Sequence, residues 1–105
     1  MSDKAWKATE RAIAAMLGGH RIPITGRQRG DVADIQHPWL SPEVKHREHL
    51  PRWIHDAMAQ AVASAKSEQL PVVILHEKGA RHRDDIISVR LGDWLDWFGH
   101  CGPSA

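Results

Sequence analysis

Cysteine is almost absent from this 105-residue sequence, which contains it only at Cys101. A single cysteine excludes an intrachain disulfide and favours a reducing compartment. Long apolar runs are missing too: none has the length of a signal-peptide core, and none approaches the roughly eighteen residues that a membrane-spanning helix needs. We therefore expect a soluble, cytoplasmic protein with no membrane segment.

Several catalytic signatures are also missing. No glycine-rich loop ends in Lys-Ser or Lys-Thr, so nothing indicates nucleotide hydrolysis. No nucleophile elbow is present, and Cys101 lies in a glycine-rich tail without an evident base, which disfavours acyl-transfer and thiol mechanisms. Of the eight histidines, His46 and His49 are three residues apart, but no cysteine pair completes a structural zinc site with them.

The chain has the size of one small domain. No internal repeat, low-complexity segment or linker divides it, so we assign residues 1–105 to a single domain. A chain of this length buries only about two-thirds of the surface that it exposes when unfolded. Its core is therefore marginal, and Trp94, Trp97 and Phe98 add apolar surface close to the C-terminus. For both reasons we expect a homodimer.

The basic residues are grouped although the net charge is only +1. Residues 1–30 contain six lysines and arginines against two acids. A second basic group, Lys78, Arg81 and Arg83, lies between two apolar runs, with His76 and His82 nearby. Local patches of this kind suit binding to a phosphate backbone. An ordinary solvated surface is the alternative.

Hydrophobic periodicity predicts a chain of mixed α and β structure. Residues 3–17 have helical spacing and end at two glycines, and a second helix begins at Pro51 and runs to about Ser67. Short strands are expected at 21–25, on either side of the turn between Pro38 and Pro42, at 72–76 and at 86–91. A helical turn capped by Asp93 follows. The predicted order is helix, three strands, helix, two strands and short helix.

Residues 30–47 contain the most informative charges. Asp34 ends the first strand-like run, and Glu43 and Lys45 open the second with one residue between them. Side chains alternate along a strand, so Glu43 and Lys45 share a face, whereas Asp31 and Asp34 face opposite sides. Two carboxylates beside an ammonium suit Mg²⁺, which is usually held by one or two carboxylates, water and phosphate oxygens. This pattern predicts phosphodiester hydrolysis.

Glu10 adds a third carboxylate from a separate element. It lies on the helical stripe formed by Trp6, Ile13 and Leu17, which we expect to face the core. A metal-site carboxylate must point inward, whereas a solvated glutamate normally occupies the opposite face. The alternative is a glutamate at the edge of the stripe that pairs with a neighbouring lysine or arginine of the same helix, Lys7 or Arg11.

Asp34 is followed about nine residues later by a Glu-x-Lys motif on the next predicted strand. This arrangement resembles the PD-(D/E)XK nuclease superfamily. The short chain and the acid on the first helix are most similar to the archaeal-type Holliday junction resolvases, including small phage versions. The sequence departs from the usual motif of this superfamily at Ala33, because a proline often precedes the first acid there. The resemblance implies a restriction-endonuclease-like α/β core, with αβββαβ order and a mixed central sheet flanked by helices.

The resemblance also implies an activity and its residues. The expected protein is a Mg²⁺-dependent endodeoxyribonuclease, with Mn²⁺ as a substitute, that acts as a homodimer on branched DNA such as four-way junctions in recombination and repair. Glu10, Asp34 and Glu43 would bind the metal ion, and Lys45 would orient or deprotonate the attacking water. Gln60 is a supporting catalytic candidate, with a surface glutamine as the alternative.

The candidate DNA contacts lie in loops and basic segments. They are Thr25, Arg27, Arg29, Arg47, Lys78, Arg81 and Arg83. Thr25 is equally explained as a hydrogen-bonding residue at a strand end. Two alternatives remain open: a phage or mobile-element nuclease that cuts flaps, nicks or duplex DNA, and a noncatalytic DNA-binding dimer with a nuclease fold.

Overall fold

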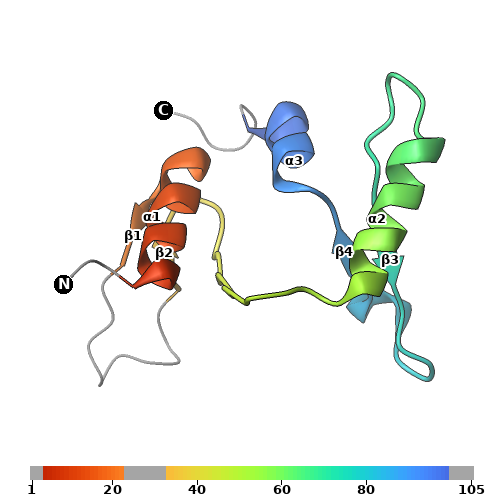
Figure 1. Ribbon diagram of the computed structural model, residues 1–105, viewed down its shortest axis with the longest axis horizontal. Coiled ribbons are helices and arrows are strands. Elements are labelled where there is room, and N and C mark those ends of the chain that lie inside the picture. The colour runs from red at the N-terminus through yellow and green to blue at the C-terminus, as the bar shows by residue number, and fades with distance from the viewer. Residues whose placement is uncertain (1–3, 23–32, 100–105) are drawn as a thin grey trace. The chain divides into compact units, whose positions relative to one another are not determined.

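The computed structural model describes residues 4–22 and 33–99, which form two compact units (Figure 1). The first unit is described over residues 4–22 and 33–48, and the second over residues 49–99. The structure is mixed α/β, as expected. Within the described ranges it contains three α-helices and two separate two-stranded antiparallel sheets. The single-domain assignment stays a prediction.

The first unit is built on helix α1 (Ala5–Leu17), which packs on strands β1 (His20–Arg21) and β2 (Ile35–Gln36) (Figure 1). Ala14 and Ile35 are its buried apolar side chains. The helix ends as its sequence predicts, because Gly18 takes a left-handed conformation with φ 79°. Gly19 then donates its N–H to the Ala14 carbonyl at 2.8 Å, which closes the last turn.

The β1–β2 ribbon is antiparallel, with His20 opposite Gln36 and Arg21 opposite Ile35. His37, which follows β2, connects this ribbon to α1. Its Nε2 lies 2.9 Å from the Leu17 carbonyl oxygen, while its Nδ1 accepts the backbone N–H groups of Trp39 and Leu40. One imidazole therefore satisfies a carbonyl at the end of α1 and also shapes the turn after β2.

The predicted third strand is not formed. The segment that contains Glu43 and Lys45 has no strand assignment, and the described sheets do not include the expected mixed central sheet. A backbone bond does join the segment to β2, from the Asp34 N–H to the Pro42 carbonyl at 3.1 Å. The next bond uses the Asp34 side chain instead of its backbone, so no regular ladder develops. The predicted strand at 21–25 is observed only as β1, and residues 23–25 lie outside the described ranges.

The second unit pairs helix α2 (Arg52–Ser64) with a hairpin of strands β3 (Val73–Leu75) and β4 (Ile86–Ser88) (Figure 1). Met58 is its buried apolar side chain, and α2 packs on β3. In the hairpin, Val73 pairs with Ser88, Ile74 with Ile87 and Leu75 with Ile86. The predicted helix and both predicted strands are present, although each strand is shorter than expected.

Helix α2 ends three residues before the predicted Ser67. The Ser64 hydroxyl donates back to the carbonyls of Gln60 and Ala61, at 3.1 and 3.3 Å. A turn between Lys66 and Gln69 then takes over. The Gln69 side-chain oxygen accepts the Lys66 N–H at 2.9 Å, while the Gln69 N–H donates to the Lys66 carbonyl at 3.0 Å. This side chain offers the backbone an alternative to the helix.

Helix α3 (Leu91–Phe98) begins earlier than predicted, with Arg90 at its N-cap instead of Asp93. None of its described side chains is buried, and Trp97 and Phe98 are exposed. Trp94 and Phe98 contact each other at 5.8 Å between ring centroids. In the part of the chain that is described, no helix is long and apolar enough to cross a bilayer.

Candidate functional site

Glu10 is buried, as its position on the helical stripe predicts, with a relative exposure of 6%. Its Oε1 accepts a hydrogen bond from Nε of Arg21 at 2.7 Å. The Arg21 guanidinium in turn lies 5.5 Å from the ring centroid of Trp6. The sequence alternatives for a partner were neighbours on the same helix, whereas this partner comes from β1. The burial of Glu10 is thus compensated by a charge from a different element.

Asp34 is the second buried acid, with a relative exposure of 7%, and it lies at the bend that precedes β2. Its carbonyl accepts the Ile22 N–H at 2.9 Å, which continues the β1–β2 pairing by one residue. Its side-chain Oδ2 accepts the Val44 N–H at 2.7 Å. With the backbone bond to Pro42, Asp34 therefore anchors residues 42–44 to the bend just before β2.

Glu43 and Lys45 flank Val44, whose amide is the one bonded to Asp34. Both charged side chains are exposed, whereas Val44 is half-buried. The side chains therefore alternate between exposed and half-buried positions as predicted, although the segment does not form a strand. The structure brings Glu-x-Lys next to the acid of the predicted motif through two hydrogen bonds at Asp34, one at Pro42 and one at Val44.

The three predicted carboxylates differ in how they fit a metal ion. Asp34 and Glu43 offer hard oxygen ligands on neighbouring segments, and Mg²⁺ requires only one or two carboxylates from a protein. Glu10 fits less well, because Arg21 already occupies its Oε1. Among the described residues, the ligand atoms of Glu10, Asp34 and Glu43 do not gather within 4.8 Å of one another. A pair from Asp34 and Glu43 is therefore the better candidate.

The predicted DNA contacts of the first unit are only partly described. Arg47 is exposed, and its Nη1 donates to the His46 carbonyl at 3.1 Å. The His46 ring lies 2.8 Å from the Thr9 hydroxyl, which ties this segment to α1. The other candidates of this unit, Thr25, Arg27 and Arg29, lie outside the described residues, as does Asp31.

Gln60 and the second basic group belong to the second unit. Gln60 is exposed on α2 and lines a hollow with other uncharged residues of α2 and β3. Lys78, Arg81 and Arg83 are exposed around the tip of the β3–β4 hairpin, where Arg81 pairs with Asp84 at 3.0 Å. These side chains are accessible to a polyanion, as predicted for a basic loop.

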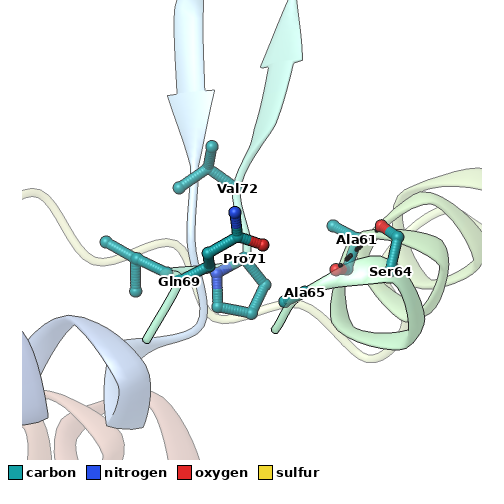
Figure 2. Close-up of a pocket in the computed structure, with 7 residues that line it drawn as sticks. Ala61, Ser64, Ala65, Gln69, Pro71 and Val72 are labelled. Carbon is teal, nitrogen blue, oxygen red and sulfur yellow. Dashed lines mark hydrogen bonds between the residues drawn. The ribbon is translucent and has the colours of Figure 1, made fainter. Parts of the chain in front are cut away.

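A second hollow lies between the C-terminal end of α2 and the segment that leads into β3, and its volume is about 410 Å³. Figure 2 shows Ala61, Ser64 and Ala65 on its helix side, opposite Gln69, Pro71 and Val72. All seven lining residues, which include Leu70, are uncharged. The hollow therefore contains neither a general acid or base nor a charged metal ligand, and we assign it no catalytic role.

One cluster was missed by the sequence analysis. His76, His82 and Asp85 come together on the β3–β4 hairpin, with ligand atoms within 4.8 Å of one another. The spacing of histidines in the sequence pointed only to His46 and His49 as zinc ligands. The hairpin register could have revealed the cluster, because the residue after β3 and the residue before β4 must face each other.

Comparison with known proteins found no relative of this chain: no protein-family model, curated protein or solved structure matches it. The resemblance to PD-(D/E)XK nucleases therefore rests only on the residues Glu10, Asp34, Glu43 and Lys45.

Proposed function

We propose that this protein is a metal-dependent endodeoxyribonuclease with a PD-(D/E)XK-type site, acting on branched DNA as a homodimer. The observation that carries the proposal is Asp34, a buried acid that bonds to Pro42 and Val44 and so holds Glu43 and Lys45 beside it. The finer fold proposed with it is a restriction-endonuclease-like core.

The roles follow from chemistry and exposure. Asp34 and Glu43 would bind the cation, and Glu10 would support them from α1. Mg²⁺ or Mn²⁺, when bound, would stabilise the charge that develops on the scissile phosphate. Lys45 is exposed and carries a strongly hydrated point charge, which suits it to orient the attacking water and to balance negative charge in the transition state. Gln60 belongs to the second unit and is given no role beside these residues.

Substrate recognition would rest on the basic residues. The exposed candidates among the described residues are Arg47, Lys78, Arg81 and Arg83. Arginine forms bidentate contacts with phosphate, so such side chains position a DNA backbone without reading its sequence. A four-way junction is the proposed substrate, and a flap, a nick or plain duplex is the alternative. A homodimer would present two sites to two strands of a junction.

The test is a cleavage assay with Mg²⁺ and Mn²⁺ on a four-way junction, a flap, a nicked duplex and a linear duplex of the same sequence. Asp34→Asn, Glu43→Gln and Lys45→Met should each abolish cleavage while leaving junction binding in place. The Asn and Gln side chains keep the shape and an oxygen acceptor. Matched controls are Glu68→Gln and Lys66→Met, which alter exposed charges on the second unit. Full activity in any of the three site variants would refute the assignment.

A second candidate is a noncatalytic DNA-binding protein, favoured by the ion pair between Glu10 and Arg21. This pair and the bond from Val44 to Asp34 give both buried acids a structural partner without a metal ion. In that case junction binding is retained but no DNA substrate is cut with either metal ion. The same assay therefore separates the two candidates.

A further inference from the structure

The β3–β4 hairpin carries two histidines and an aspartate at its loop end, beyond the Leu75–Ile86 pair. His76 directly follows β3 and Asp85 directly precedes β4, so they are the next opposed pair after Leu75 and Ile86. His82 comes from the 3-10 turn η1 (His82–Asp84) between the strands. The three side chains are therefore positioned by the hairpin register and by one tight turn.

The Asp85 carboxylate bridges the two imidazoles. Its Oδ1 lies 2.6 Å from Nδ1 of His76, and its Oδ2 lies 3.2 Å from Nδ1 of His82. The two rings stack with 4.5 Å between their centroids. Both histidines thus present the same ring nitrogen to one carboxylate, so the three potential ligands converge on a common point.

These separations are close to those of ligands that share one metal ion, and the three ligand atoms all lie within 4.8 Å of one another. Zinc binds histidine nitrogen and carboxylate oxygen at about 2.0–2.2 Å, so two ligands of one ion lie roughly 3–3.5 Å apart. The 3.2 Å pair already has this spacing, and the 2.6 Å pair needs only a small side-chain adjustment. A backbone bond from the Asp85 N–H to the His82 carbonyl, at 3.0 Å, keeps these two residues together.

The donor set selects the kind of ion. Two imidazoles with one carboxylate suit Zn²⁺ and similar first-row ions, whereas Mg²⁺ and Ca²⁺ prefer sites made entirely of oxygen. Three protein ligands leave a coordination position for water or another group. His82 has a side-chain exposure of 85%, so the open side of the cluster is accessible, while Asp85 is largely covered at 14%.

We propose that His76, His82 and Asp85 bind one divalent transition-metal ion, with Zn²⁺ as the preferred ion. The site is separate from the one proposed for DNA cleavage, and it differs in ligand chemistry. Its physical effect is to cross-link the two strands and the connecting loop at the loop end of the hairpin. A two-stranded hairpin is marginally stable in water, so a metal ion bound only to the folded form would stabilise it.

The nearby basic side chains oppose a cation and set the expected affinity. Lys78, Arg81 and Arg83 are all exposed close to the cluster in sequence, and Arg81 is partly neutralised by its pair with Asp84. We therefore expect micromolar binding of one equivalent, weaker than a closed four-ligand structural site.

The test uses the full chain without a histidine tag, freed of metal by a chelator and titrated with Zn²⁺ by calorimetry. Co²⁺ serves as a second probe, because its visible absorption reports the coordination of the bound ion. The expected result is one site whose affinity falls at least tenfold in His82→Ala and in Asp85→Asn. Zn²⁺ should also raise the melting temperature of the native sequence but not that of His82→Ala.

Two matched controls keep the interpretation specific. His55→Ala removes an exposed histidine of α2, and Glu68→Gln removes an exposed acid outside the hairpin; neither should change the affinity by more than twofold. His82 is exposed, so its loss should not unfold the protein, and circular dichroism verifies this.

Equal Zn²⁺ binding by the native chain and by His82→Ala or Asp85→Asn overturns the proposal. Absence of stoichiometric binding overturns it as well, and would leave Asp85 as a hydrogen-bond acceptor for two imidazoles.

Discussion

Arg21 and Glu10 form an ion pair that joins β1 to α1, with 2.7 Å between Nε and Oε1. Only 16% and 8% of the two side chains are exposed, so each charge depends on the other for compensation. The flat guanidinium also covers the ring of Trp6. This pair explains how a small unit with only two buried apolar side chains among its described residues tolerates a buried carboxylate.

Removing one member of this pair should be costly. Arg21→Met leaves Glu10 buried without a partner, and we expect a loss of about 3–5 kcal/mol in the free energy of unfolding. Glu10→Gln should cost less, because Arg21 can extend toward solvent. Chemical denaturation followed by the NMR signal of the buried Ile35 methyl groups measures both. The Arg21→Met/Glu10→Gln double variant completes the cycle, and a coupling near zero would contradict the ion pair.

Asp34 should stabilise the first unit through its side-chain acceptor. Asp34→Ala leaves the Val44 N–H without its acceptor and should lower the free energy of unfolding by about 1–3 kcal/mol. Asp34→Asn keeps an oxygen acceptor there and should cost less. Amide hydrogen exchange at Val44 is the direct measurement, and the rate should rise in Asp34→Ala. Unchanged protection in that variant would show that the bond is not formed in solution.

The Nε2 atom of His37 should carry the imidazole proton. Its Nδ1 accepts two backbone N–H groups, from Trp39 and Leu40, so that atom cannot carry a proton itself. Nitrogen-15 chemical shifts of the imidazole distinguish the two tautomers. His37→Phe should destabilise the first unit by about 1–3 kcal/mol, because the Leu17 carbonyl and both amides lose their partner. His20→Phe, at an exposed position of β1, is the control.

Gly19 should not accept a side chain. A Cβ there would overlap the Gln36 carbonyl oxygen and touch Ile35, and backbone atoms cannot move aside easily. We expect Gly19→Ala to lower stability by about 1–3 kcal/mol or more. Gly92→Ala is the matched control, since nothing lies within 4 Å of that position and alanine favours the helix. Thermal unfolding followed by circular dichroism compares the two, and equal melting temperatures would contradict the close approach.

DNA affinity should depend on salt according to the number of phosphates contacted. If Arg47 or Arg83 meets one phosphate, its replacement by alanine weakens binding to all sequences and lowers the slope of log affinity against log salt by about one. Arg52→Ala is the control, because Arg52 pairs with Asp56 on α2. Fluorescence anisotropy at several salt concentrations gives the slope. Identical slopes for the native chain and for Arg47→Ala and Arg83→Ala would remove these residues from the DNA contacts.

Much of the local structure could be predicted from the sequence. The stop of α1 at Gly18, the start of α2 after Pro51 and the presence of strands β3 and β4 follow from glycine, proline and apolar periodicity. The inward position of Glu10 also followed from its stripe. The end of α2 was misplaced, since a glutamine side chain five residues beyond Ser64 competes with the helix.

The prediction of a third strand was wrong for a related reason. Alternating charges at Glu43 and Lys45 predict a strand, but strand formation also needs a ladder partner. Asp34 supplies a carboxylate in place of a backbone carbonyl, so the segment is anchored beside β2 and does not extend the sheet. Periodicity contains no information about which neighbour a backbone N–H will find.

The sequence by itself determined which segments become helices and hairpins, because these depend on local backbone preferences and on the spacing of apolar residues. Only the tertiary structure decided which charges meet. Arg21 reaches Glu10, Asp34 accepts from Val44, and Asp85 bridges His76 and His82 because of strand register and helix packing. Those partners are separated by three to eleven residues, and a separation along the chain does not specify a distance until the chain has folded.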